Sequence, residues 1–162
     1  MARISEQEAG GRNVVAFLDM LGVSEGTNDG RQETKDDGYD VLVGGKLFTG
    51  YADHPNVLVK LSPSLSSTAA GRYQILYRYW PHYRALLKLP DFGPLSQDRY
   101  AIQQFKEQRA IADIQAGRFD EAVAKVRNIW ASLPGAGYGQ HEQKIERLRD
   151  AYLRAGGTLV EA

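Results

Sequence analysis

The stretch from Asn13 to Asn28, NVVAFLDMLGVSEGTN, constrains the fold most, because it predicts a helix that carries a carboxyl group on its apolar side. Four apolar residues recur there at helical spacing: Val14, Phe17, Leu18 and Leu21. One helical turn beyond Leu21 places Glu25 on the same stripe. Gly26 is a typical helix stop, so we expect the helix to end at Glu25.

Two effects act on the predicted Glu25 carboxyl in the same direction. Partial burial disfavours its ionised form, and so does the negative end of a helix dipole. Both should raise its pKa, which suits a group that must donate a proton near neutral pH. The alternative is a helix-terminal glutamate that reaches solvent or pairs with Arg31.

The composition narrows the class of protein. A chain of 162 residues is long enough for one domain with a real core, and we expect residues 1–162 to form a single domain. Its 20 basic and 20 acidic residues cancel, which argues against nucleic acid as the main partner. Because cysteine is absent, neither a disulfide framework nor a thiolate metal site is possible.

The N-terminal residues 1–12, MARISEQEAGGR, are polar and mixed in charge, and we expect a loosely held leader. The apolar run that follows is interrupted by Asp19, so it is neither an export signal nor a membrane span. Any work outside the inner membrane would therefore need another protein to let this one through.

A small β region is predicted next. The polar stretch from Thr27 to Gly38 reads as a long loop. The segment YDVLVGGKLF, Tyr39 to Phe48, predicts a hairpin around Gly44-Gly45, and Val57 to Leu61 predicts a third short strand.

The remainder of the chain predicts helices. Ser66, Ser67 and Thr68 offer N-caps for a helix over 69–87, with a break or kink at Pro81. Three more helices are expected over 96–116, 119–133 and 142–155. The fold class is therefore α+β, mainly helical with a small β-hairpin subdomain.

Several site types find no support. The loop PGAGYG, Pro134 to Gly139, lacks the Lys-Ser/Thr of a nucleotide loop and follows a helix, so it presents Tyr138 either as a packing plug or as a ring for a ligand. The histidines, His54, His82 and His141, show no ligand spacing, so we expect neither metal nor cofactor. No serine-nucleophile elbow is present.

Carboxylates and aromatic rings are the better candidates. Asp36 and Asp37 read as solvated, whereas Asp40 begins the hairpin and is better placed to be held in position. Nine tyrosines and two tryptophans would suit a saccharide cleft, but aromatic residues at helical spacing are more often core. We expect Trp80 and Trp130 to be core residues.

Five segments together carry a resemblance to the lambda-type phage endolysins: AFLDMLGVSEGT, GRQ-TK-GYDV-VGG-LF, DHP, STAAGRYQ-L and NIWASLPGAGYGQ. The resemblance runs from about Ala16 to Val160. It implies a lysozyme-like fold, with the β-hairpin subdomain flanking a saccharide cleft, and a lytic transglycosylase acting on peptidoglycan. In that family the glutamate of the Ser-Glu-Gly motif, here Glu25, is the catalytic acid and base.

The resemblance also implies the surroundings of the reaction. The matching GRYQ and GAGYG elements imply that Tyr73, Gln74 and Tyr138 lie in the saccharide cleft. We expect Asp40 and Gln74 to act as orienting or charge-stabilising groups. A monomer without cofactor would accumulate in the host cytoplasm. It would reach peptidoglycan glycan strands in the periplasm once a separate holin permeabilises the membrane.

Two other functions stay open. In a hydrolytic muramidase Asp40 would assist Glu25. A wall-binding relative would have kept the fold and lost the chemistry. One position departs from the family pattern, because Val23 stands where a tryptophan precedes the Ser-Glu pair. The smaller side chain could leave the acid less desolvated.

Overall fold

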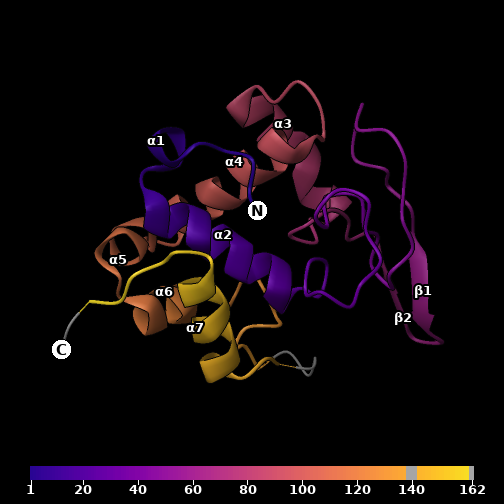
Figure 1. Ribbon diagram of the computed structural model, residues 1–162. Coiled ribbons are helices and arrows are strands. Elements are labelled where there is room, and N and C mark those ends of the chain that lie inside the picture. The colour runs from indigo at the N-terminus through magenta and orange to yellow at the C-terminus, as the bar shows by residue number, and fades with distance from the viewer. Residues whose placement is uncertain (138–141, 161–162) are drawn as a thin grey trace.

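The computed structural model describes residues 1–137 and 142–160 (Figure 1). Within these ranges the chain is mainly helical with one small antiparallel sheet, so the predicted α+β class is confirmed. The elements are α1 Glu6–Ala9, α2 Arg12–Ser24, β1 Val59–Ser62, β2 Leu65–Ser67, the 3₁₀ helix η1 Tyr77–Tyr79, α3 Trp80–Leu87, α4 Pro94–Glu107, α5 Ile111–Ala116, α6 Phe119–Val126 and α7 Ile145–Arg154.

Helix α2 is the centre of the molecule. In Figure 1 it crosses the middle, with α3 and α4 on one side, α6 and α7 on the other, and the β1–β2 sheet beyond its C-terminal end. The predicted apolar stripe is confirmed, since Val14, Phe17, Leu18 and Leu21 have no exposed surface. Phe17 meets Phe105 of α4 edge to face, with 5.2 Å between ring centroids. The core therefore fixes the end of α2 rigidly.

The N-terminal segment is not a loosely held leader, and that expectation was wrong. Ala2, Ile4 and Ala9 are buried in the core. The backbone N–H of Ala2 donates to Asp19 at 2.7 Å. Ser5 caps α1 by accepting from the backbone N–H of Glu8. The polar composition of residues 1–12 predicted a loose segment, but the few apolar residues that stand between the polar ones are buried in the core.

The β subdomain differs from the prediction in register. The expected hairpin at 39–48 forms a tight turn with a single bridge between Val41 and Leu47. The described sheet lies later: its strand β1 overlaps the short strand predicted over Val57 to Leu61, and Val59 of β1 pairs with Ser67 of β2. The predicted helix cap at Ser66-Ser67 is therefore strand.

The helix predicted over 69–87 begins only at Trp80, with Pro81 in its first turn rather than at a kink. Gly71 and Gln74 adopt φ values of 82° and 52°, which a continuous right-handed helix cannot contain. The segment between them instead folds back, and Ala70 bridges to both Leu42 and Ile75. The prediction of a continuous α-helix before Trp80 was therefore wrong.

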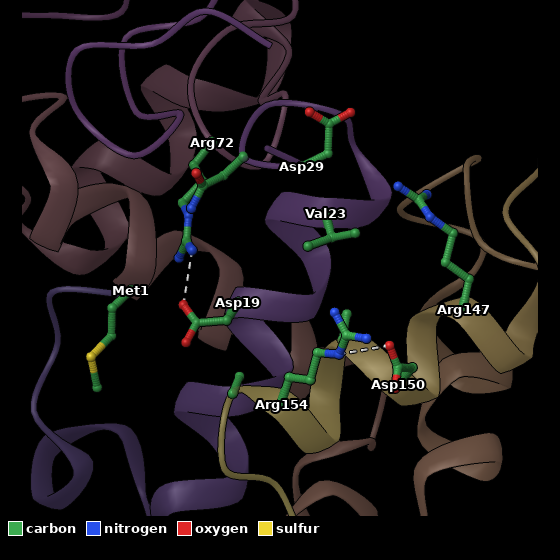
Figure 2. Close-up of a pocket in the computed structure, with 11 residues that line it drawn as sticks. Met1, Asp19, Val23, Asp29, Arg72, Arg147, Asp150 and Arg154 are labelled. Carbon is green, nitrogen blue, oxygen red and sulfur yellow. Dashed lines mark hydrogen bonds and ion pairs between the residues drawn. The ribbon is translucent and has the colours of Figure 1, made fainter. Parts of the chain in front are cut away.

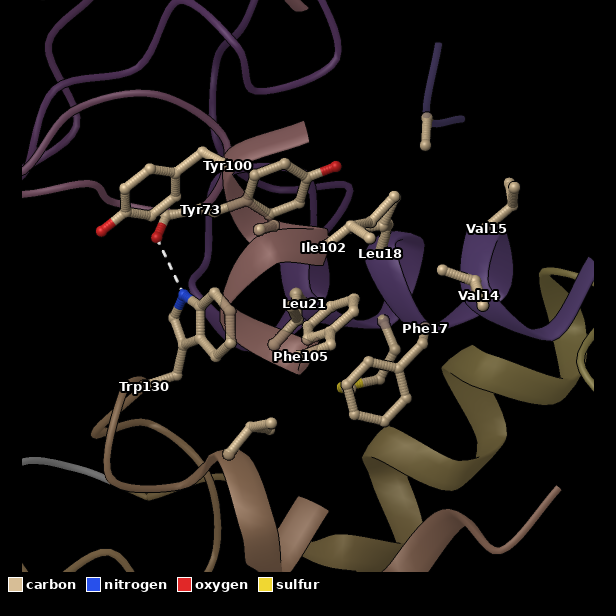
Figure 3. Packing of buried hydrophobic residues seen from close by; sticks show 14 of the residues in the cluster. Val14, Val15, Phe17, Leu18, Leu21, Tyr73, Tyr100, Ile102, Phe105 and Trp130 are labelled. Atoms are coloured by element: carbon tan, nitrogen blue, oxygen red, sulfur yellow. Dashed lines mark hydrogen bonds between the residues drawn. The ribbon is translucent and has the colours of Figure 1, made fainter. Parts of the chain in front are cut away.

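The later helices form with shorter bounds. The one expected over 96–116 is divided into α4 and α5, because Arg109 has a φ of 60° between them. Ser96 lies inside α4 and donates to Asp91 instead of capping. Both tryptophans are core residues as predicted, and Figure 3 shows the Trp130 indole N–H donating to the Tyr73 carbonyl, at 3.0 Å.

Candidate active site

Glu25 lies at the C-terminal end of α2, where its backbone N–H still donates to Leu21 O at 2.8 Å. Its side chain borders a cavity of about 720 Å³ between the β subdomain and the helical lobe. One wall carries Leu61 and Leu65 of the sheet and Leu58 just before β1. The opposite wall carries Ser132 on the segment after α6. A rigid helix thus presents one carboxyl group to an open cavity.

The pKa of this carboxyl is shifted toward neutrality. Burial raises the pKa of Glu25 to about 7, and the hydrogen bond from Ser132 opposes the shift. The alternative ion pair with Arg31 does not form among the described residues. A carboxyl with this pKa exchanges its proton readily near neutral pH, as a general acid must.

Ser132 is a site residue that sequence reasoning missed. Its hydroxyl donates a short hydrogen bond to Glu25 Oε2, and it lies 2.7 Å from the hydroxyl of Ser24. Gln143 joins the two serine-bearing segments, since its backbone N–H donates to Ser132 O at 2.8 Å and its amide to Ser24 O at 3.3 Å. The segment NIWASLPGAGYGQ contained the signal, but glycine patterning cannot reveal which element faces Glu25.

Gln74 borders the same cavity as Glu25. Its backbone has a φ of 52°, and its side-chain amide donates to Gly71 O at 2.9 Å and Val41 O at 3.3 Å. These bonds hold the side chain in one orientation at the cavity wall. The geometry therefore brings Gln74 together with Glu25.

Asp40 and Tyr73 do not line the Glu25 cavity. The Asp40 carboxylate is buried and accepts hydrogen bonds from the Thr34 hydroxyl at 2.6 Å and the Lys35 N–H at 3.1 Å. The Tyr73 side chain is buried, and its hydroxyl donates to Asp98 at 2.6 Å. Both side chains brace the scaffold, and Tyr73 also borders an adjoining cavity along the helical lobe. The third saccharide residue expected, Tyr138, lies outside the described residues.

A second cavity of about 560 Å³ continues the first along the helical lobe. The two share Gln74, Leu76, Arg78, Ile129 and Ala131. Tyrosine and amide side chains line the continuation: Tyr79, Tyr83, Tyr100, Gln104 and Asn128. Aromatic faces with polar rims suit a neutral saccharide chain.

Val23 points into a different cavity, shown in Figure 2. This cavity of about 540 Å³ is also bordered by Asp29, Arg147 and the Asp19–Arg72 ion pair. Val23 does not border the Glu25 cavity. The departure from the family pattern therefore lies away from the acid.

Substituting Val23→Trp should accordingly leave the pH dependence of activity unchanged to within a few tenths of a pH unit. The larger ring would fill the cavity of Figure 2 without covering the Glu25 carboxyl. Rates measured between pH 4 and 9 test this expectation. A limb displaced by about one pH unit would mean that position 23 does control desolvation of the acid.

The described residues contain neither a metal-binding cluster nor a membrane-spanning helix. No group of three or more histidine, aspartate or glutamate side chains in that part of the chain could hold a metal ion. Its helices are too short or too polar to cross a bilayer.

Comparison with known proteins gives consistent results. A family model described as Endolysin matches residues 15–159. The chain is 57% identical over 146 residues to the endolysin of Escherichia phage lambda, covering 90% of this chain and 92% of the relative. It is 53% identical over 157 residues to the endolysin of Escherichia phage P2, covering 91% and 94%.

Solved structures match equally well. A bacteriophage lambda lysozyme complexed with a chitohexasaccharide superposes with a TM-score of 0.89 at 54% identity, covering 98% of this chain and 99% of the other. A second lysozyme from bacteriophage lambda gives a TM-score of 0.85 at 53% identity, with the same coverage. The lysozyme-like fold inferred from the resemblance is thereby confirmed.

Proposed function

The chain belongs to the endolysin family, and from that premise we propose that it is a lytic transglycosylase. Its substrate is bacterial peptidoglycan, and it cleaves the β-1,4 bond between N-acetylmuramic acid and N-acetylglucosamine. Residues 1–162 act as a single catalytic domain. The glycan ligand of the lambda lysozyme of similar structure supports a saccharide chain as substrate.

Glu25 performs both proton transfers in this mechanism. Its carboxyl gives a proton to the bridging glycosidic oxygen, the bond from that oxygen to muramyl C1 breaks, and an oxocarbenium-like state develops. The resulting carboxylate takes the proton from the muramyl C6 hydroxyl. That oxygen then bonds to C1, which leaves a 1,6-anhydro end and restores protonated Glu25.

One observation carries this choice of reaction. Among the described residues that border this cavity, Glu25 is the only one with a carboxyl group. Glu107 borders the adjoining cavity, and its carboxylate accepts hydrogen bonds from Tyr83 and Gln103. Hydrolysis through an activated water or a covalent intermediate uses two carboxylates that flank the scissile bond. Asp40, the candidate partner, accepts hydrogen bonds from its own loop. An internal hydroxyl of the substrate removes the need for that second group.

The masses of the products test the proposal. Digestion of purified cell walls is expected to give muropeptides lighter by one water than those from a hydrolytic muramidase run in parallel. Digestion in ¹⁸O-labelled water should leave the muramyl ends unlabelled. Reducing, ¹⁸O-labelled ends would establish the hydrolytic alternative, and intact walls together with retained binding would establish the wall-binding alternative.

The setting follows from the same proposal. The protein accumulates as a monomer in the host cytoplasm and acts on glycan strands in the periplasm. Release depends on a separate holin in this proposal, as the resemblance to the lambda-type endolysins implies. Neither metal nor cofactor is needed for the proposed steps, and nucleic acid is not a partner.

A further inference from the structure

The two oxygens of the Glu25 carboxyl differ in their surroundings. Oε2 accepts the hydrogen bond from the Ser132 hydroxyl. Oε1 has no hydrogen-bond partner among the described residues, and the carboxyl borders the open cavity. A proton on Oε1 is therefore available to a ligand, whereas a proton on Oε2 would be held against Ser132.

Ser24 gives the hydrogen bonds of this group a preferred direction. If Ser24 donates to Ser132, and Ser132 donates to Oε2, each hydroxyl hydrogen has an acceptor. In the reverse direction Oε2–H donates to Ser132 and Ser132 donates to Ser24. The Ser24 hydroxyl hydrogen then has no acceptor among the described residues, although Ser24 is only 3% exposed. Leaving a buried donor unpaired costs free energy, so the first direction is favoured.

Gln143 holds the two serines at hydrogen-bonding distance. It bonds to the backbone carbonyls of both residues, and its own side-chain oxygen accepts from Arg147 on α7. The hydroxyls are thus fixed through their backbones rather than by flexible side chains. A fixed donor needs little reorganisation when charge develops on Glu25.

We propose that Ser24 and Ser132 form a directional hydroxyl chain that keeps the catalytic proton of Glu25 on Oε1, the oxygen that meets substrate. Ser132 is a positioning residue in this account, and Ser24 sets the direction in which it donates. The inference rests on the proposed function, because it assigns the proton that Glu25 transfers. It also explains why the same oxygen, Glu25 Oε1, can first donate the proton as an acid and then accept one as a base.

Charged neighbours do not offer the same control. Arg78 of η1 borders the same cavity, while Asp29 after α2 and Arg147 of α7 border the cavity of Figure 2. None of the three forms a hydrogen bond or ion pair with the Glu25 carboxyl. The hydroxyl of Ser132 is the described group that bonds to it.

Two substitutions at Ser132 provide the main test. Ser132→Ala removes the donor to the carboxylate, so the pKa of Glu25 should rise by roughly one pH unit and kcat should fall on the order of tenfold, with KM nearly unchanged. Ser132→Thr keeps a hydroxyl and should restore most of both properties. The pKa is read from the ¹³C shift of the labelled Glu25 carboxyl, and kcat and KM from soluble glycan fragments.

Ser24→Ala has a different expected signature. Ser132 can still donate to the carboxylate, so the pKa should stay close to that of the parent. With Ser24 Oγ removed, the reverse direction would leave the Ser132 hydrogen without its acceptor, so Ser132 keeps donating to Oε2 and kcat should stay within about twofold of the parent value. Equal effects of Ser24→Ala and Ser132→Ala on the pKa would contradict the directional chain.

Ser64→Ala is the matched control, because Ser64 is exposed and does not border the cavity. It should leave the pKa and kcat as in the parent. An unchanged carboxyl titration in a folded Ser132→Ala protein would overturn the inference while leaving Glu25 as the acid. Since the titration needs no turnover, it also remains decisive if the reaction itself proves to be hydrolysis.

Discussion

Substituting Glu25→Gln should abolish cell-wall clearing, with kcat lowered on the order of a thousandfold or more. Glutamine has nearly the same shape and can still accept the Ser132 hydrogen bond to its carbonyl oxygen. It cannot donate a proton as an acid or take one from a hydroxyl. Turbidity loss of purified walls and release of soluble fragments measure the effect.

Glu121→Gln is the matched control, since Glu121 is exposed on α6 and does not border the cavity. Its activity should equal that of the parent. Circular dichroism should show both variants folded. Substantial activity in a folded Glu25→Gln protein would show that the acid has been misassigned.

The pH dependence of the parent follows from the same carboxyl. Because the pKa of Glu25 is about 7, the fraction of enzyme that holds the acidic proton falls as the pH rises through that value. The rate should therefore decline on the alkaline side of neutrality. A rate that stays constant to pH 9 would contradict a raised pKa in the free enzyme.

Stability should respond with a defined sign. The folded state binds the Glu25 proton more tightly than the unfolded chain, whose glutamate has its ordinary pKa of 4.5. Below pH 4.5 the carboxyl is protonated in both states, so its raised pKa does not lower the free energy of unfolding of the parent. The parent loses stability as the pH rises above 4.5 and through about 7. Glu25→Gln should unfold like the parent at pH 4. At pH 8 it should be more stable by about 2 kcal/mol, after allowance for the partial exposure of the group.

Sequence reasoning placed Glu25 correctly at the end of α2 because two local patterns coincide there, whereas its role as the acid came from the family resemblance. The apolar spacing of α2 put the residue on the buried stripe, and Gly26 marked the end of the helix. Neither inference needs tertiary structure. The elevated pKa followed from the same placement, and burial is indeed its main cause.

The partners of the acid could not be found in the same way. Ser132 is 107 positions along the chain from Glu25, and only the packing of the helical lobe brings it to α2. Asp40 was chosen from its place in a predicted hairpin, but its carboxylate is used to bond Thr34 and Lys35. The sequence also did not predict which residues adopt left-handed backbone conformations. The left-handed φ of Gln74 lies inside the helix predicted over 69–87, which in the structure begins only at Trp80.

The N-terminal segment is another case in which the local sequence could not predict a long-range contact. One buried carboxylate in α4 holds this segment in place. Asp98 has no exposed surface and accepts four hydrogen bonds. The hydroxyls of Tyr39 and Tyr73 donate to Oδ1 at 2.7 and 2.6 Å. The backbone N–H groups of Arg3 and Ile4 donate to Oδ2, both at 2.9 Å.

Substituting Asp98→Ala should therefore lower the free energy of unfolding by about 4 kcal/mol, since it leaves several buried donors unpaired. The melting temperature should fall by roughly 10 °C. Asp98→Asn keeps one acceptor oxygen and should lose about half as much, which secures the test if the alanine variant does not fold. Asp120→Ala, which removes an exposed ion pair with Arg149, should cost less than about 1 kcal/mol.

Hydrogen exchange separates the local role of Asp98 from a general loss of packing. If Asp98 holds the N-terminal segment, the amides of Arg3 and Ile4 should exchange much faster in Asp98→Asn, while amides of central α2 change only with global stability. Uniform acceleration across both regions would mean that the carboxylate supports the core as a whole. Unchanged exchange at Arg3 and Ile4 would mean that apolar burial of Ala2 and Ile4 is sufficient to hold the segment.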